Sequence, residues 1–244
     1  MAETAEKVGV VFVSHSESIA RGLVDLARQM APTAVLAAAG GTDDGRIGTS
    51  FDRVSAAIAD ADAGAGAVVL CDLGSAILTA ETALEFLDDA QRERVRLVDA
   101  PLVEGGVAAA VAAESGAPLD EVVAAARSAA GGAAVGDAAP QAGVSGGVSD
   151  EASDREGGRP ALRRTVTLVN ADGLHARPAA ELVKLASKFP QRVTVNGVDA
   201  RSLLAIMALG LNAGAQIEVA SDDPTGEAAV EAIADLAESG FGET

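Results

Sequence analysis

The chain has 244 residues, with 18 Lys and Arg against 36 Asp and Glu and a net charge of −18. Its length suits about two domains. No part is basic: the net charge is −11 over residues 1–136 (9 basic minus 20 acidic), −3 over 137–161 (2 minus 5) and −4 over 162–244 (7 minus 11). Nucleic acid and anionic membrane surfaces are therefore poor partners, because affinity for either depends on clustered Lys and Arg.

Cysteine usage and the N-terminus indicate a cytoplasmic protein. Cys71 is the only cysteine, so an intramolecular disulfide and a cysteine-built zinc site are both impossible, which favours a reducing compartment. The apolar stretch near the N-terminus has six residues, too few for a signal peptide, and no stretch approaches the roughly 20 apolar residues of a membrane span. We expect a soluble chain that is not exported.

A strand, a turn and a helix recur along the first 130 residues. Residues 8–13 read VGVVFV, the β-branched run of a strand buried on both faces, and 18–30 carry apolar side chains at helical spacing. The elements predicted next are strands at 34–38, 67–71 and 95–98 and helices at 50–61, 76–87, 103–114 and 119–130. This alternation predicts an α/β domain, residues 1–130, with a doubly wound parallel sheet that binds its ligand at the carboxyl ends of the strands.

Residues 131–160 break this pattern. They hold eight Gly and two Pro in thirty residues, with no Leu, Ile or aromatic side chain to bury. We predict a flexible linker with a root-mean-square span of about 30 Å, taken as ~5–6 Å times the square root of its length.

The order of elements changes after the linker. Strands are predicted at 164–170, 192–196, 197–200 and 216–220, and helices at 175–188, 202–211 and 225–238. The order βαββαβα predicts a second domain, residues 161–244, that folds as an α+β open-faced sandwich of about 80 residues.

Both histidines of the chain lie in turns that follow a predicted strand and begin a helix. A helix N-terminus stabilises a bound phosphate, and neutral imidazole has a ring nitrogen free to attack phosphorus. Taken alone, His15 fits a surface or capping role equally well. His175 has stronger support, because Arg177 can cover a phosphoryl group with a two-pronged donor and Ala176 adds a backbone position at the helix start.

Other loops at the carboxyl ends of the first set of strands can assist His15. Gly41 and Thr42 follow the second strand and can approach a phosphate through the backbone and a hydroxyl. Asp72 follows the third strand, and we expect its carboxylate to bond one ring nitrogen of His15 and leave the other exposed. Ser75 fits either a phosphate donor or a cap for the next helix, and we favour the cap.

The second domain resembles HPr, the histidine phosphocarrier of the phosphoenolpyruvate-dependent phosphotransferase system. The resemblance rests on GLHARPAAELVKLASKF at 173–189, Asn-Gly at 196–197 and DARSLLAIMALG at 199–210, and covers about residues 162–240. It implies that enzyme I phosphorylates His175 and that Arg177 stabilises the phosphate. Ser202 matches the family's regulatory serine by position, although we favour an ordinary helix N-cap.

The first domain is similar to the mannose-family IIA fold, and more closely to the phosphotransferase subunit of phosphoenolpyruvate-dependent dihydroxyacetone kinase (the DhaM type). The segments that carry the resemblance are VSHS at 13–16, AGGT at 39–42, IGTS at 47–50, CDLGSA at 71–76 and APLVEG at 100–105. It implies that His15 accepts phosphate from the carrier histidine and that the domain forms a homodimer.

The sequence has no GxxxxGK[ST] loop and no run of spaced carboxylates, so we expect no metal, nucleotide or other cofactor to be bound directly. The resemblance implies a phosphate path from phosphoenolpyruvate through enzyme I, His175 and His15 to ADP held by a second kinase subunit, and then to dihydroxyacetone on a third. Because the chain ends at Thr244, we expect enzyme I to act in trans.

Two alternatives remain open from the sequence. One is a sugar-transport IIA protein that passes phosphate to a IIB partner, and the other is a phosphorylation sensor without enzymatic activity. In the leading interpretation, the linker raises the local concentration of the carrier to about the millimolar range, although the two acidic domains repel each other at long range. We therefore expect His15 to receive phosphate mostly from His175 of the same chain or dimer.

Overall fold

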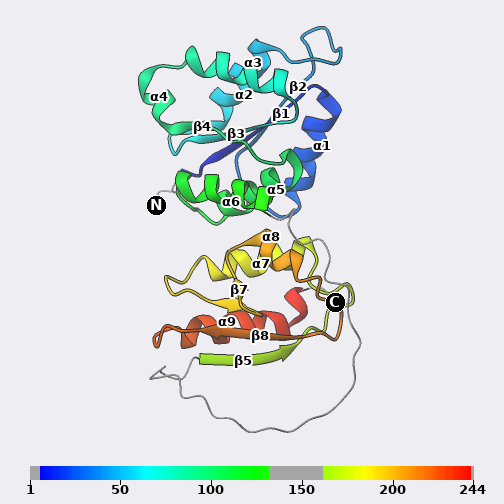
Figure 1. Ribbon diagram of the computed structural model, residues 1–244, viewed down its shortest axis with the longest axis vertical. Coiled ribbons are helices and arrows are strands. Elements are labelled where there is room, and N and C mark those ends of the chain that lie inside the picture. The colour runs from blue at the N-terminus through cyan, green and yellow to red at the C-terminus, as the bar shows by residue number, and fades with distance from the viewer. Residues whose placement is uncertain (1–5, 132–161, 243–244) are drawn as a thin grey trace.

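The structure, a computed structural model, describes residues 6–131 and 162–242 (Figure 1). We call these ranges the N-terminal region and the C-terminal region. The predicted linker at 131–160 lies outside the described residues except for the backbone of Gly131, so its flexibility remains a prediction.

The N-terminal region is built on a four-stranded parallel sheet in the order β2-β1-β3-β4. The strands are β1 (Gly9–Ser14), β2 (Leu36–Gly40), β3 (Ala67–Cys71) and β4 (Val95–Leu97). Every residue of β1 and of β3 is buried, which explains why both read as continuous apolar runs rather than as alternating ones. The predicted parallel sheet is confirmed.

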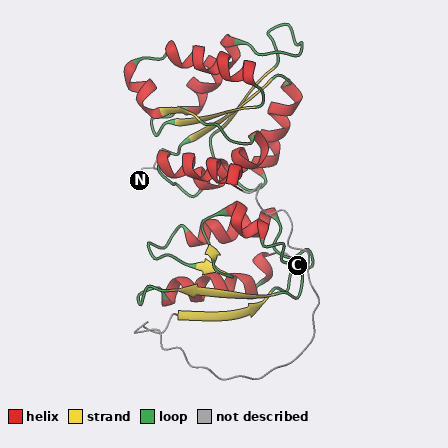
Figure 2. Ribbon diagram, in the orientation of Figure 1, coloured by secondary structure: helices red, strands yellow, loops and turns green. Residues whose placement is uncertain are grey.

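Helices cover both faces of this sheet (Figure 2). On one face pack α1 (Glu17–Arg28), α5 (Leu102–Glu114) and α6 (Leu119–Gly131), and on the other pack α2 (Phe51–Ala61) and α3 (Gly74–Glu85). The apolar core is thus divided by the sheet into two layers, as a doubly wound fold requires. The carboxyl end of β1 is left open at one edge of these layers.

The C-terminal region has a second sheet, antiparallel and in the order β5-β8-β6-β7. Its strands are β5 (Leu162–Thr167), β6 (Thr194–Val195), β7 (Val198–Asp199) and β8 (Gln216–Ser221), and its helices are α7 (Ala176–Ala186), α8 (Leu203–Ala208), α9 (Glu227–Glu238) and the 3-10 turn η2 (Gly240–Gly242). Alternate residues of β5, Arg163, Thr165 and Thr167, are exposed on the face away from the helices. The predicted order and open-faced sandwich are confirmed.

Several predicted boundaries were wrong. The helix α4 (Asp89–Arg94) was not predicted, because its six residues bury no side chain and so carry no apolar periodicity. The strand predicted at 34–38 lies at β2 instead, and continues through Gly40, which pairs with Ser14. A Cβ atom on Gly40 would lie 2.6 Å from the carbonyl oxygen of Ser16, so the glycine permits close packing and does not mark a turn.

The two regions pack against each other. Met30 after α1 and two valines of α5, Val107 and Val111, join the apolar core of the C-terminal region. The contacting helices are α5 and α6 on one side and α7 and α8 on the other (Figure 1).

Candidate functional site

The strand order brings His15 and Asp72 together. From β1 the chain crosses to β2 on one side and then to β3 on the other, so the carboxyl ends of β1 and β3 meet where the winding direction changes. Val13 pairs with Cys71 in the register of these strands; Asp72 follows Cys71 directly, and His15 follows Val13 after Ser14. Open parallel sheets bind their ligands at such positions.

The Asp72 carboxylate accepts four hydrogen bonds, three of them from the His15 turn. Oδ1 accepts from the ring Nδ1 of His15 at 2.9 Å and from the backbone N–H of Leu73 at 2.7 Å. Oδ2 accepts from the backbone N–H of His15 at 2.9 Å and from the Ser14 hydroxyl at 2.8 Å. The contact between Asp72 and the imidazole ring is the one predicted from the sequence.

Sequence reasoning missed the role of Ser14. It is the last residue of β1, it is fully buried, and it fixes the second carboxylate oxygen of Asp72. The available signal was a hydroxyl residue ending an otherwise apolar buried strand, since a buried hydroxyl requires a partner.

The environment of Asp72 keeps its carboxyl ionised. Burial raises its pKa, but hydrogen bonds from the backbone and ring of His15 and from Ser14 outweigh burial and hold the pKa below its usual value. An ionised carboxylate can only accept, so Nδ1 of His15 carries the proton that this bond requires. In the neutral imidazole, Nε2 then carries the lone pair.

Ser75 contacts the opposite side of the imidazole ring. Its Oγ lies 2.5 Å from Nε2 of His15, so the hydroxyl donates to the lone pair. The preferred prediction for Ser75, a helix cap, was wrong: the N-cap of α3 is Leu73, which makes no side-chain capping bond. Ser75 does not cap the helix because it lies inside the first turn of α3, where its side chain contacts the His15 ring.

Two helix N-termini meet at His15. Helix α1 begins directly after it, with Ser16 as N-cap accepting from the backbone N–H of Ile19 at 3.4 Å. Helix α3 begins at Gly74 and supplies Ser75. The positive ends of both helix dipoles favour an anion at the exposed side of the ring, and the His15 side chain is 20% exposed.

Gly41 and Thr42 are engaged in their own loop. Gly41 has a φ of 74°, a conformation that favours glycine, and its N–H donates to the carbonyl oxygen of Ser14 at 3.1 Å. The Thr42 hydroxyl donates to Asp44 at 2.5 Å. The structure therefore uses both residues to shape the loop beside the His15 turn and does not bring the Thr42 hydroxyl to the ring.

His175 lies at the N-terminus of α7, in the C-terminal region. It is the N-cap residue, its side chain is exposed, and its N–H donates to the carbonyl oxygen of Gly173 at 3.0 Å. Asn170, which sequence reasoning missed, is buried and donates through Nδ2 to the same oxygen at 2.5 Å. Gly173 has a φ of 65°, and a Cβ atom there would clash with the carbonyl oxygen of Leu211. The turn before His175 is thus closely fixed.

The remaining candidates surround α7 and α8. Ala176 and Arg177 are the first two residues of α7, where backbone N–H groups have no acceptor within the helix, and the Arg177 side chain is exposed. Ser202 is the N-cap of α8 and accepts from the backbone N–H of Ala205 at 3.4 Å, which agrees with the capping role that we favoured. The two histidine turns lie in different regions and are not brought together (Figure 1).

Within residues 6–131 and 162–242, no group of three or more His, Cys, Asp or Glu side chains could hold a metal ion. In the same ranges, no helix is long and apolar enough to span a bilayer.

Comparisons with known proteins assign each region separately. Residues 9–123 match the family described as the PTS system fructose IIA component, and residues 162–239 match the PTS HPr component phosphorylation site.

Some relatives match nearly the whole chain, and others match one of its two regions. The phosphoryl donor subunit DhaM of the PEP-dependent dihydroxyacetone kinase of Providencia stuartii is 34% identical over 244 residues, which cover 97% of this chain and 50% of that protein. The corresponding subunit of kinase 2 of Listeria innocua is 44% identical over 105 residues, 43% of this chain and 84% of that protein. Phosphocarrier protein HPr of Cupriavidus necator is 37% identical over 86 residues, 34% of this chain and 97% of that protein. The chain spans about half the length of the relatives that it matches almost from end to end.

Proposed function

Because the chain belongs to the family of DhaM phosphoryl donor subunits of PEP-dependent dihydroxyacetone kinases, we propose that it relays a phosphoryl group from His175 to His15. In this proposal the phosphate comes from phosphoenolpyruvate through enzyme I, and His15 passes it to ADP held by a second kinase subunit for transfer to dihydroxyacetone. The chain is then a phosphotransferase component that binds no cofactor of its own, and it works in the cytoplasm.

The chemistry at His15 follows from its hydrogen bonds. The Nε2 lone pair forms a bond to phosphorus while the N–P bond at the donor histidine breaks, and the donor nitrogen keeps the electron pair of that bond. Nδ1 keeps its proton, so the phosphorylated ring carries a positive charge beside Asp72. The carboxylate stabilises that charge, and the same contact makes Nε2 the reactive atom.

The phosphoryl oxygens need donors once the phosphate is bound. The Ser75 hydroxyl, 2.5 Å from Nε2, turns from the lone pair to a phosphoryl oxygen, and the N–H groups at the starts of α1 and α3 supply further positive potential. These groups already have their positions before the phosphate arrives, so the transfer costs little reorganisation.

At His175 the donors are the start of α7 and an arginine. The N–H groups of Ala176 and Arg177 and the Arg177 guanidinium can contact phosphoryl oxygens on the ring. Exposure of His175 and Arg177 fits a group that must be reached in turn by a donor protein and by an acceptor histidine.

The observation that carries this proposal is the Asp72–His15–Ser75 arrangement at the carboxyl edge of a parallel sheet. The test combines phosphoenolpyruvate, enzyme I, the chain and the other two kinase subunits, and measures dihydroxyacetone phosphate. We expect product from the parent chain and none from His15→Ala or His175→Ala. A mixture of the two variants should recover activity, since each supplies one intact histidine. Full product from either variant alone would contradict the relay.

The family description of residues 9–123 as a fructose IIA component favours one second candidate, transfer to a IIB protein for sugar uptake. The same assay separates the candidates, because phosphate would then appear on an added IIB protein and not in dihydroxyacetone phosphate. A phosphorylated chain that passes phosphate to neither acceptor would indicate a sensor.

We further propose that the N-terminal region forms a homodimer. Large apolar side chains remain exposed on α3 and on the neighbouring loop, with Leu78 64%, Phe86 76% and Ile47 77% exposed. Such side chains often mark an association surface. Sedimentation equilibrium should give twice the mass of one chain for the parent and a lower mass for Phe86→Asp.

A further inference from the structure

Helix α5 is buried on two sides. Ala109, Ala110 and Ala113 pack in the core beneath the first sheet. Val107 and Val111 lie four residues apart on another face and pack in the core of the C-terminal region. A helix that is apolar all round is normally covered all round. The C-terminal region is the cover for the second face of α5.

Charged side chains of both signs border the edges of this packing, although both regions are acidic overall. Glu114 at the end of α5 borders a cleft with Lys188 of the other region. Glu114 itself pairs with Lys7 at 3.3 Å, and Lys184 in the same cleft pairs with Glu181 at 3.0 Å. Glu121 of α6 borders a second cleft with Lys188 and Arg201. Lys188, which borders both clefts, therefore places a positive charge near the acidic side chains of the N-terminal region.

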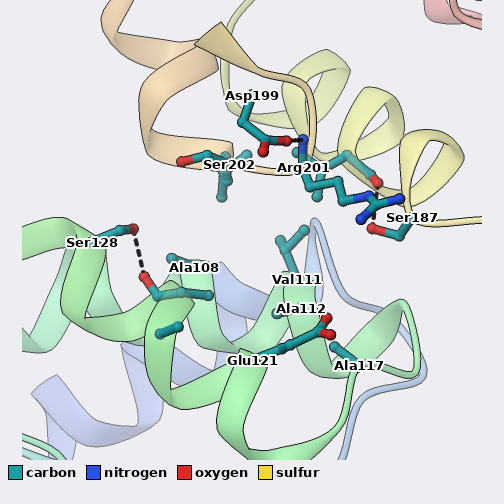
Figure 3. Close-up of a pocket in the computed structure, with 14 residues that line it drawn as sticks. Ala108, Val111, Ala112, Ala117, Glu121, Ser128, Ser187, Asp199, Arg201 and Ser202 are labelled. Carbon is teal, nitrogen blue, oxygen red and sulfur yellow. Dashed lines mark hydrogen bonds between the residues drawn. The ribbon is translucent and has the colours of Figure 1, made fainter. Parts of the chain in front are cut away.

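The interface is incompletely packed. A cleft of about 340 Å³, partly open to solvent, lies between α5 and α6 on one side and α7, α8 and the turn before α8 on the other. Figure 3 shows side chains that line it. Its walls include Ala108, Val111 and Ala112 from the N-terminal region and Arg201 and Ser202 from the C-terminal region. Atoms that line this cleft lack contacts across it, which weakens the packing between the two regions.

The docked arrangement keeps the two histidine turns apart. His15 precedes the first residue of α1, whereas Met30, which packs against the C-terminal region, follows its end. The twelve residues of α1 span about 18 Å at 1.5 Å per residue. Figure 1 shows the same relation: the carboxyl end of β1 lies far along the long axis from the start of α7. Phosphoryl transfer needs reacting atoms about 3–3.5 Å apart.

We propose that the packing of α5 and α6 against α7 and α8 is a resting, docked state that withholds His175 from His15. Transfer within one chain then requires the regions to separate and meet again through a different surface. This inference rests on the proposed relay between the two histidines. It adds a conformational step that limits how fast phosphate passes inside the chain.

The test uses Lys188→Glu in the full-length chain, because Lys188 is exposed and borders both clefts. Arg163→Glu is the matched control, since it makes the same charge change on the exposed face of β5, where Arg163 pairs with Glu218. Each chain is charged at His175 with phosphoenolpyruvate and enzyme I and then diluted. Transfer to His15 is followed in a single turnover, and small-angle scattering and amide exchange of residues 107–111 report docking.

We expect Lys188→Glu to have a larger radius of gyration and faster amide exchange in α5 than the parent. Its transfer of phosphate to His15 should be about 3- to 5-fold faster, which is the size of effect expected when one exposed charge contact is lost. Arg163→Glu should match the parent in all three. Transfer that is slower or unchanged although the interface has opened would overturn the proposal. Slower amide exchange in α5 at higher protein concentration would also overturn it, because a second copy of the chain would then cover this helix. If neither the parent nor any variant passes phosphate to His15, the proposed relay is wrong, and the docked state cannot withhold His175. Scattering and amide exchange would still show whether the two regions are docked.

Discussion

Asp72→Asn tests whether one carboxylate sets the reactive nitrogen of His15. Each carboxylate oxygen accepts two hydrogen bonds: Oδ1 from Nδ1 of His15 at 2.9 Å and from the N–H of Leu73, and Oδ2 from the Ser14 hydroxyl and the N–H of His15. An amide keeps one oxygen and replaces the other with an NH2 group. If the oxygen faces Nδ1, the NH2 group meets the donors Ser14 and backbone N–H. If the NH2 group faces Nδ1, the proton moves to Nε2 and the nucleophile is lost.

In either orientation of the amide, the variant loses a hydrogen bond to the ionised carboxylate, and such a bond contributes about 1.5–3 kcal/mol. We therefore expect phosphate transfer to His15 to slow about 10- to 150-fold, at 1.36 kcal/mol per factor of ten. Charging of His175 by enzyme I should not change. The assay is a single turnover with an alkaline quench and mass spectrometry of the two histidine peptides. Asp60→Asn, on the exposed face of α2, is the matched control for loss of one charge.

Stability should change with pH in a defined direction. The pKa of Asp72 is lower in the folded chain than in the unfolded chain, so its contribution to the free energy of unfolding is present at neutral pH and is lost as pH falls below about 4. The parent should be more stable than Asp72→Asn in urea at pH 7, and the difference should shrink in acid.

Transfer to His15 in Asp72→Asn within twofold of the parent would refute this account of the site.

Three further predictions follow from other contacts. Ser75→Ala removes the donor beside Nε2 and should slow transfer to His15 about 3- to 10-fold in the same assay, the effect of one neutral hydrogen bond. Gly40→Ala forces a Cβ atom to 2.6 Å from a carbonyl oxygen and should cost about 1–3 kcal/mol in urea unfolding, whereas Gly22→Ala, with open space in α1, should stabilise the chain by about 0.5–1 kcal/mol. Burial, with a smaller effect of nearby carboxylates, raises the pKa of Cys71 to about 12, so iodoacetamide at pH 8 should label the thiol only in denaturant. Rapid labelling of the folded chain would show that the β3 end opens readily.

The parts of the site that follow strand ends could be predicted from the sequence. Buried parallel strands read as apolar runs, their carboxyl ends meet at one edge, and polar residues at those ends therefore converge. That reasoning located Asp72 beside His15 without knowing the strand order. It could not give the register of β1 and β3, which decides which residues of neighbouring turns face each other.

The errors share a physical cause. Ser75 and Thr42 each have a hydroxyl in a turn, and the sequence cannot state whether a turn hydroxyl points along its own backbone or across to another loop. We favoured a capping role for Ser75 and a phosphate contact for Thr42. In the fold Ser75 contacts His15, and Thr42 bonds Asp44 within its own loop. The packing of α5 against α7 was likewise hidden, because an Ala-rich helix has no pattern that distinguishes one covered face from two.

The location of His15 directly after β1, one of the two inner strands, has a mechanical consequence. Strand β1 is paired with β2 and with β3 and is buried on both faces, so it is a rigid support for the turn that carries His15. His175 lies at the exposed N-terminus of α7, and the turn before it is also closely fixed. When the two rings align for transfer, both turns keep their shape, so the adjustments of angle and distance come from movement of one region as a whole against the other.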